Sequence, residues 1–149
     1  MAVVYRTRHS TGHRPDAFVV HCSDPRYQGH FHDFLTGHLG LHSYGLIVAP
    51  GGPQLLRAGE LLPKFAWAGW RWAKFLMDIA RPPRVILIGH DDCRWYTEGP
   101  FRHVRGESKE RVIADLRAVR EEILERFPAV AVELYFARLD GDNAVIEGV

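Results

Sequence analysis

The chain has 149 residues, of which 46% are apolar and 25% charged, a composition that suits one soluble globular domain with its own core. Its formal net charge of +1 gives no electrostatic argument for a nucleic acid or a membrane surface as partner. No apolar run reaches the roughly 18–20 residues of a membrane span, and the N-terminal residues lack the apolar stretch of a secretory signal. We therefore expect a cytoplasmic protein with a single domain over residues 1–149.

The first half of the chain contains three hydrophobic segments. The β-branched run at 17–21 predicts a strand, and the run at 44–48 predicts a second one. The second run stops at Pro50-Gly51-Gly52-Pro53, a strong loop signal that indicates either a plain turn or a close backbone approach to a pocket wall. From Leu55 to Ala80 apolar residues recur at helical spacing, which predicts a long helix with Pro63 in a first turn or at a break.

The second half alternates strands and a helix. The continuous apolar run at 84–89 is typical of a parallel strand covered on both faces. An amphipathic helix is expected over 108–127, a strand over 130–139 and a short edge strand over 144–149. Helices between hydrophobic strands imply right-handed crossovers. The predicted fold is therefore an α/β domain whose central, mostly parallel sheet has four to five strands and is flanked by helices.

The only two cysteines and one histidine follow two of these strands. Cys22 comes directly after the first strand, and His90 and Cys93 come directly after the run at 84–89. Open α/β sheets place their ligands beyond the carboxyl ends of the strands, so neighbouring strands would bring these three side chains together. His21 is not expected to join them, because alternation along the strand turns it to the opposite face.

Two thiolates and one imidazole are suitable ligands for zinc, although buried thiols that act only as small hydrophobes are the plainer alternative. No third cysteine exists to complete a structural site, so the fourth position would go to water or to Asp24. Arg26 lies two residues beyond Asp24 and can form a bidentate pair with it. That pair would keep the carboxylate ionised and oriented beside the metal.

Cys22-x-Asp24-x-Arg26 together with His90-x-x-Cys93 resembles the two signature motifs of β-class carbonic anhydrases, and the likeness extends over about residues 18–149. The resemblance implies that the cysteines and the histidine are zinc ligands and that Asp24 and Arg26 form a catalytic dyad. It implies reversible hydration of carbon dioxide to bicarbonate by zinc-bound hydroxide. It also implies a homodimer, or a larger homo-oligomer of dimers, with active-site walls shared between subunits.

The sequence departs from the family pattern beside these motifs. Arg94 replaces the glycine that usually follows the last cysteine, and Pro25 replaces the small residue between the dyad members. Val48-Ala49-Pro50-Gly51 replaces the usual Arg-Asn-Ala-Gly. Asp91 and Asp92 add negative charge between two ligands, which would raise the pKa of bound water. These departures bear on the substrate pocket, the dimer geometry and the rate, and they leave the ligand set intact.

Two other functions stay open from the sequence. The same hydroxide would attack carbonyl sulfide or carbon disulfide, so a hydrolase of these linear molecules is a close variant. A zinc-binding regulatory or interaction protein with little catalysis is the alternative from another class. The intact pair of Asp24 and Arg26 favours an enzyme, because a purely structural zinc site does not need it.

Two further groups have ordinary explanations. Trp67, Trp70, Trp72 and Phe75 recur at helical spacing, which favours core packing or contacts within a dimer over the lining of a channel. Four histidines are expected to be solvated surface residues and not a proton shuttle or a second metal site: His30, His32, His38 and His42.

Overall fold

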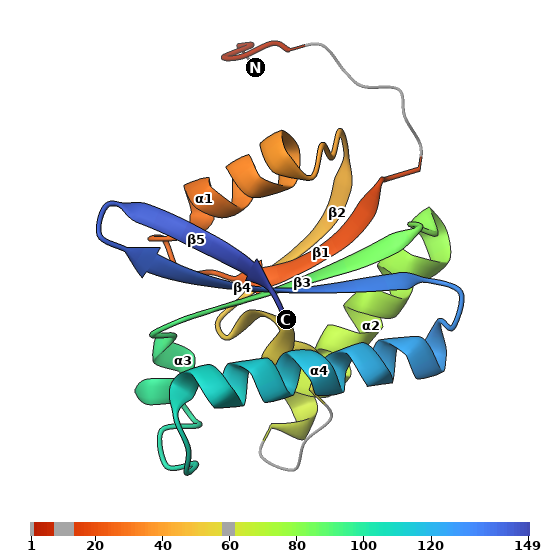
Figure 1. Cartoon of the computed structure of the whole chain (residues 1–149). Helices are drawn as coiled ribbons and strands as arrows, with labels where there is room; N and C mark the ends of the chain where they lie inside the picture. Colours follow the sequence, from red (N-terminus) through yellow and green to blue (C-terminus); the bar gives the residue numbers. More distant parts are fainter. Residues whose placement is uncertain (1, 8–13, 58–61) are drawn as a thin grey trace.

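The computed structural model describes residues 2–7, 14–57 and 62–149. Its centre is a five-stranded sheet with the strand order β2-β1-β3-β4-β5, shown in Figure 1. The first four strands pair in parallel, and only β5 is antiparallel to its neighbour β4. This confirms the predicted α/β class. The elements are β1 (Ala17–Cys22), α1 (Gln28–Asp33), the π-helical η1 (Phe34–His38), β2 (Tyr44–Ala49), the 3₁₀-helical η2 (Gly52–Leu56), α2 (Pro63–Ala80), β3 (Arg84–His90), α3 (Arg94–Thr97), α4 (Ser108–Arg126), β4 (Ala131–Asp140) and β5 (Asn143–Gly148).

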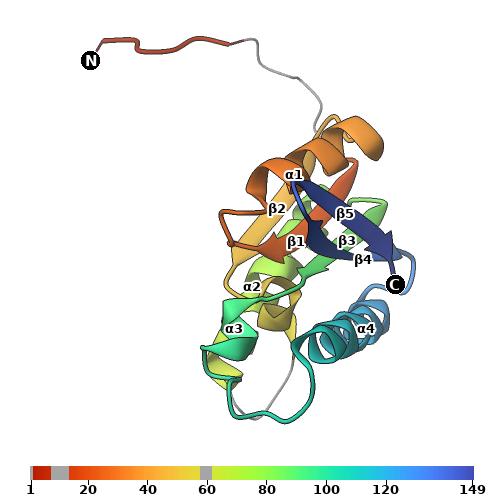
Figure 2. The same ribbon diagram turned by 60° about the vertical axis from the view of Figure 1, so that its left-hand side comes forward.

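Helices cover both faces of the sheet, which explains why the central strands are apolar throughout. α1 lies on one face, and α2 and α4 lie on the other, as Figures 1 and 2 show. On the α1 side, Phe31 and Ile88 belong to one buried cluster. On the opposite side, Leu87 and Leu116 belong to a second, larger one. Successive residues of β3 thus enter different cores, so the strand is buried along nearly its whole length.

The carboxyl ends of β1 and β3 lie side by side because these two strands are direct neighbours. Their register pairs Val20 with Leu87 and His21 with Ile88. Figure 2 shows both strands running to the same edge of the sheet, with α3 beyond it. Any side chains that follow these two strands therefore share one location, and this position decides where the candidate site lies.

The long helix predicted from Leu55 begins later than the apolar spacing indicates. Residues 52–56 form the 3₁₀-helix η2, and α2 begins at Pro63. Pro63 therefore lies in the first turn of the helix, which is one of the two positions that the sequence predicts for it. Gly51 and Gly52 both have positive φ, and this conformation turns the chain sharply after β2 instead of starting an α-helix there. Residues 58–61 of the predicted helix lie outside the described residues.

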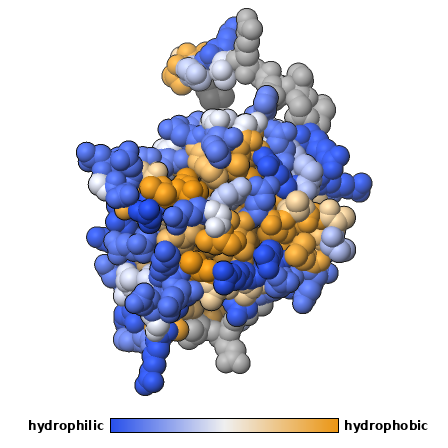
Figure 3. Space-filling view, in the orientation of Figure 1, coloured by the Kyte–Doolittle hydropathy of each residue, from blue (hydrophilic) through white to orange (hydrophobic). Residues whose placement is uncertain are grey.

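Apolar residues also reach the surface where the sheet meets α4. In the space-filling view of Figure 3, a band of them lies between the sheet and this helix and is bordered by hydrophilic residues. Among the described residues, no helix combines the length and the apolar character that crossing a bilayer requires.

Candidate metal centre

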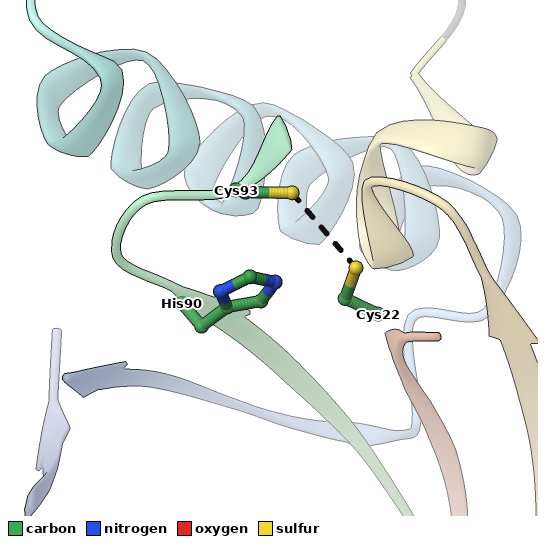
Figure 4. Close-up of side chains that lie close together, drawn as sticks. All are labelled: Cys22, His90 and Cys93. Atoms are coloured by element: carbon green, nitrogen blue, oxygen red, sulfur yellow. Dashed lines mark hydrogen bonds between the residues drawn. The ribbon is translucent and has the colours of Figure 1, made fainter. Parts of the chain in front are cut away.

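Cys22, His90 and Cys93 meet at the carboxyl edge of the sheet, as Figure 4 shows. Cys22 is the last residue of β1, and His90 is the last residue of β3. Cys93 follows three residues later, directly before α3, and the intervening turn brings its sulfur back over the strand ends. The fold thus brings together the three side chains that the sequence predicts as ligands.

The three donor atoms have the spacing and the burial of a metal site. They all lie within 4.8 Å of one another, and all three residues are buried. The sulfurs of Cys22 and Cys93 are 3.8 Å apart. Two thiolates on a tetrahedral zinc ion, each about 2.3 Å from the metal, are also separated by about 3.8 Å. The donor set therefore fits zinc without any displacement of the sulfurs.

The imidazole of His90 offers its free nitrogen to the same point. Nδ1 lies 2.7 Å from the backbone carbonyl oxygen of Asp91, which can only accept a hydrogen bond, so the proton is on Nδ1. Nε2 is buried and has no hydrogen-bond partner among the described residues. The ring of Tyr27 packs against the imidazole, with 4.5 Å between the two ring centroids, and holds its orientation. A buried nitrogen lone pair without a partner is costly, and a metal ion would satisfy it.

The two thiols behave as one titrating pair. Hydrogen bonding from Cys93 is the main cause that lowers the pKa of Cys22. The same contact raises the pKa of Cys93. The contact between the sulfurs therefore favours one thiolate beside one thiol. A bound divalent cation would displace the proton of that thiol, because thiolates and not thiols ligate zinc.

Asp24 and Arg26 form the bidentate pair that the sequence predicts. Arg26 Nη2 donates to Asp24 Oδ2 at 2.8 Å, and Nε donates to both carboxylate oxygens at 3.1 and 3.2 Å. The backbone N–H of Arg26 adds a bond of 3.0 Å to Oδ1. These hydrogen bonds lower the pKa of Asp24 and keep it ionised. Asp24 is not a member of the Cys–His–Cys group and faces Arg26 instead.

Asp92 holds the guanidinium of Arg26 from its other side. Arg26 Nη1 donates to Asp92 Oδ2 and Nη2 donates to the Asp92 carbonyl oxygen, both at 3.2 Å. Asp92 adopts a left-handed conformation with φ of 50°, which turns both acceptors toward the arginine. The loop that carries Cys93 is thereby joined to the loop that carries Asp24.

The glycine pair after β2 packs directly against the site. A Cβ on Gly52 would lie 2.7 Å from the backbone nitrogen of Cys22, and a Cβ on Gly51 would overlap the indole of Trp95. Gly52 also has φ of +55°. The segment is therefore the close backbone approach that was one of its two sequence interpretations, and it fixes the position of Cys22.

We expect Gly52→Ala to destabilise the chain by about 2–4 kcal/mol, because it combines left-handed strain with a contact against backbone atoms. Gly29→Ala is the matched control, since a Cβ at Gly29 meets nothing within 4 Å and the residue lies inside α1. Alanine there should leave stability unchanged or raise it. Urea unfolding of both variants measures the difference, and equal stability would show that the close approach does not matter.

Comparison with solved structures gives this arrangement a fold family. A carbonic anhydrase from Streptococcus mutans matches with a TM-score of 0.58 and 14% identity, over 95% of this chain and 87% of that one. A β-carbonic anhydrase from Aspergillus fumigatus matches with a TM-score of 0.52 and 13% identity, over 91% and 76% of the two chains. The chain has the fold of the β-carbonic anhydrases. Another such enzyme, from Trichomonas vaginalis, matches with a TM-score of 0.51 and 14% identity, over 95% and 87%.

The likeness to β-carbonic anhydrases is structural. A scan against protein-family models finds no match, and a search of curated proteins finds none either. At 13–14% identity the solved structures establish the fold, while the chemistry has to be argued from the side chains of this chain.

Several residues near the motifs lie outside the donor group. His21 is buried on the α1 side, where it packs against Phe31 and where Nδ1 meets the carbonyl of Cys22. Arg94 is 77% exposed and pairs with Glu98, so it extends into solvent. The four histidines of 30–42 form no metal-binding group among the described residues.

Two residues that support the site carry no recognisable signal in the sequence. Gln28 Nε2 donates to the carbonyl oxygens of Cys22 and Asp24 at 2.9 and 2.8 Å, so it ties the loop after β1 to α1. From the sequence, Asp92 is only an additional negative charge between two of the predicted ligands. Its contact with Arg26 joins residues 66 positions apart, and only the folded chain shows it.

Proposed function

We propose that the chain is a zinc-dependent carbonic anhydrase that catalyses the reversible hydration of carbon dioxide to bicarbonate. The observation that carries this proposal is the convergence of two thiols and one unpartnered imidazole nitrogen beside a carboxylate already locked by an arginine. A structural zinc site would need the first feature and not the second. The shared fold supports the same conclusion.

Cys22, His90 and Cys93 would hold the metal. Zinc, when bound, lowers the pKa of a water molecule so that hydroxide is available near neutral pH. The two sulfurs supply the negative charge that retains the cation, and the Asp91 carbonyl keeps the His90 tautomer that presents Nε2. These three protein donors would leave one position on the ion open.

Asp24 and Arg26 would orient the reaction. An ionised Asp24 accepts a hydrogen bond from the attacking water, which directs the water's remaining lone pair at the carbon of carbon dioxide. Arg26 prevents the carboxylate from turning toward the metal, because two of its side-chain nitrogens already donate three hydrogen bonds to the two oxygens. One proton leaves to solvent or buffer for each bicarbonate formed.

Stopped-flow measurement of carbon dioxide hydration at pH 7 and pH 8.5, with zinc quantified in the same sample, tests the proposal. We expect a rate well above that of the buffer when the chain holds about one zinc ion. Full zinc content without any such rate at either pH would contradict the carbonic anhydrase proposal.

Asp92→Asn should lower the hydration rate by no more than about fivefold and leave the zinc content unchanged. The reason is that Asp92 contacts Arg26 through a side chain that is 72% exposed, and exposed ion pairs contribute about 0–1 kcal/mol. The same stopped-flow assay measures it. A loss as large as that from removing Asp24 would mean that Asp92, and not Arg26 alone, determines the dyad geometry.

The exposed apolar face of β2 and α2 supports the dimer as part of the proposal. Trp72 and Phe75 are 57% and 62% exposed, and with Leu46 and Val48 they line one shallow hollow. Leu46 and Val48 lie on β2, which is an edge strand of the sheet. Of the two interpretations, core packing holds for Trp70, whereas the exposed Trp67, Trp72 and Phe75 are left with contacts within a dimer. An apolar face of this kind is typical of a protein–protein contact.

Phe75→Glu should convert a dimer into monomers, because it places a charge in the centre of this apolar face. Lys74→Glu is the matched control, since Lys74 is exposed on the same helix but is not part of the hollow. Sedimentation equilibrium of both variants and the unaltered chain measures the mass. A monomeric unaltered chain, or a dimer that tolerates Phe75→Glu, would contradict this assignment of the interface.

A further inference from the structure

A second cavity lies on the helical side of the sheet, apart from the candidate metal centre. Its volume is about 380 Å³, within the range of small-molecule sites. Apolar side chains from three parts of the chain form most of its wall, among them Leu55, Phe65 and Phe101. Neither the three candidate ligands nor the dyad lines it. The cavity is therefore not the place where carbon dioxide would react.

Arg111 places a guanidinium in the wall of this apolar cavity. Nη1 and Nη2 donate to the carbonyl oxygens of Phe101 and Tyr96 at 2.7 and 3.1 Å, and neither acceptor carries a formal charge. Nε is buried and has no hydrogen-bond partner among the described residues. No carboxylate in the described part of the chain forms an ion pair with Arg111. A cation beside apolar walls is stabilised by an anion that brings its own apolar surface.

The remaining charged groups of the cavity pair with one another or with a neighbouring carboxylate. Arg57 and Asp115 line it together, and their ion-pair distance is 3.4 Å. The second oxygen of Asp115 accepts a hydrogen bond of 2.9 Å from the buried phenol of Tyr96. Burial raises the pKa of Asp115. Arg57 also pairs with Glu122 at 3.4 Å, so two carboxylates share its charge. Arg111 is therefore the guanidinium of the cavity that has no ion pair among the described residues.

We propose that this cavity binds a small organic monocarboxylate with an apolar body about the size of one aromatic ring. The carboxylate would meet the guanidinium of Arg111. The apolar body would occupy the space between Phe65 and Phe101. This site is independent of the proposed zinc chemistry, because it shares no lining residue with the metal centre.

Titration calorimetry of the zinc-loaded chain with benzoate, and with benzyl alcohol as its neutral counterpart, tests the proposal. We expect benzoate to bind with a dissociation constant in the millimolar range or below, and benzyl alcohol to bind at least about tenfold more weakly. Equal binding of the two probes, or no benzoate binding up to tens of millimolar, would overturn the proposal.

Variants separate this cavity from the metal centre, which could also attract benzoate. Ala114→Phe fills the cavity from the exposed face of α4, and Arg57→Gln removes one charge without breaking the backbone contacts that Arg111 makes. Each should weaken benzoate binding at least about fivefold, with zinc content unchanged. Arg117→Gln on the same helix lies outside the cavity and should bind as the unaltered chain does. Benzoate affinity that survives both cavity variants would overturn the assignment.

Discussion

Cys93→Ser is expected to remove zinc from the chain, from about one ion per chain to less than about a tenth. Serine offers a hydroxyl that stays protonated and cannot replace a thiolate on the metal. Because metal binding contributes to folding, loss of an ion held about a thousandfold above its dissociation constant lowers stability by roughly 4 kcal/mol. For a chain of this size the melting temperature should fall by about 10 °C. Elemental analysis and calorimetry of the same sample measure both effects.

His21→Gln provides the control for a buried histidine that lies beside the site without ligating. His21 packs against Phe31 on the α1 face, whereas His90 presents Nε2 to the sulfurs. We expect His21→Gln to lose stability yet keep its zinc, and His90→Gln to lose the zinc. If both Cys93→Ser and His90→Gln retained about one zinc ion per chain, the metal would have to bind elsewhere.

Asp24→Ala is expected to keep zinc and lose most of the hydration rate, by roughly 10- to 100-fold, the usual cost of removing a group that orients a metal site. Its carboxylate is not in the donor group, so removing it leaves the Cys–His–Cys set complete. Arg26 loses its main partner and would move toward Asp92, to which it already donates. Stopped-flow measurement of carbon dioxide hydration, with zinc quantified in the same preparation, separates a loss of zinc from a loss of hydration rate.

Asp33→Ala, at the end of α1 and outside the site, is the matched control for removal of a carboxylate and should hydrate carbon dioxide as the unaltered chain does. If Asp24→Ala were equally active, the pair with Arg26 would be a structural loop contact and the assignment of a catalytic dyad would be wrong.

The convergence of Cys22, His90 and Cys93 was predictable because it depends on only two facts about the chain. Hydrophobic runs locate β1 and β3, and neighbouring parallel strands end at one edge, so Cys22 and His90 must be close once these strands pair. Cys93 is three residues beyond His90 and cannot be far away. The pair of Asp24 and Arg26 is equally local, since its members are two positions apart.

Other features depend on contacts that apolar spacing does not encode. The predicted helix from Leu55 failed at its start because the positive φ values of Gly51 and Gly52 turn the chain into η2, and a periodic pattern carries no information on φ. Helical spacing also left core packing and contacts within a dimer open for Trp72 and Phe75. Apolar periodicity identifies a face that avoids water, but it does not say whether this chain or a second copy covers that face.

The coordination of bound zinc tests the central claim most directly. X-ray absorption at the zinc edge of the loaded chain should show two sulfur neighbours at about 2.3 Å and two nitrogen or oxygen neighbours at about 2.0–2.1 Å. That result would assign both cysteines and leave one nitrogen for His90 and one position for water. A spectrum with no sulfur neighbour, or with only one, would contradict the shared metal site of Cys22 and Cys93.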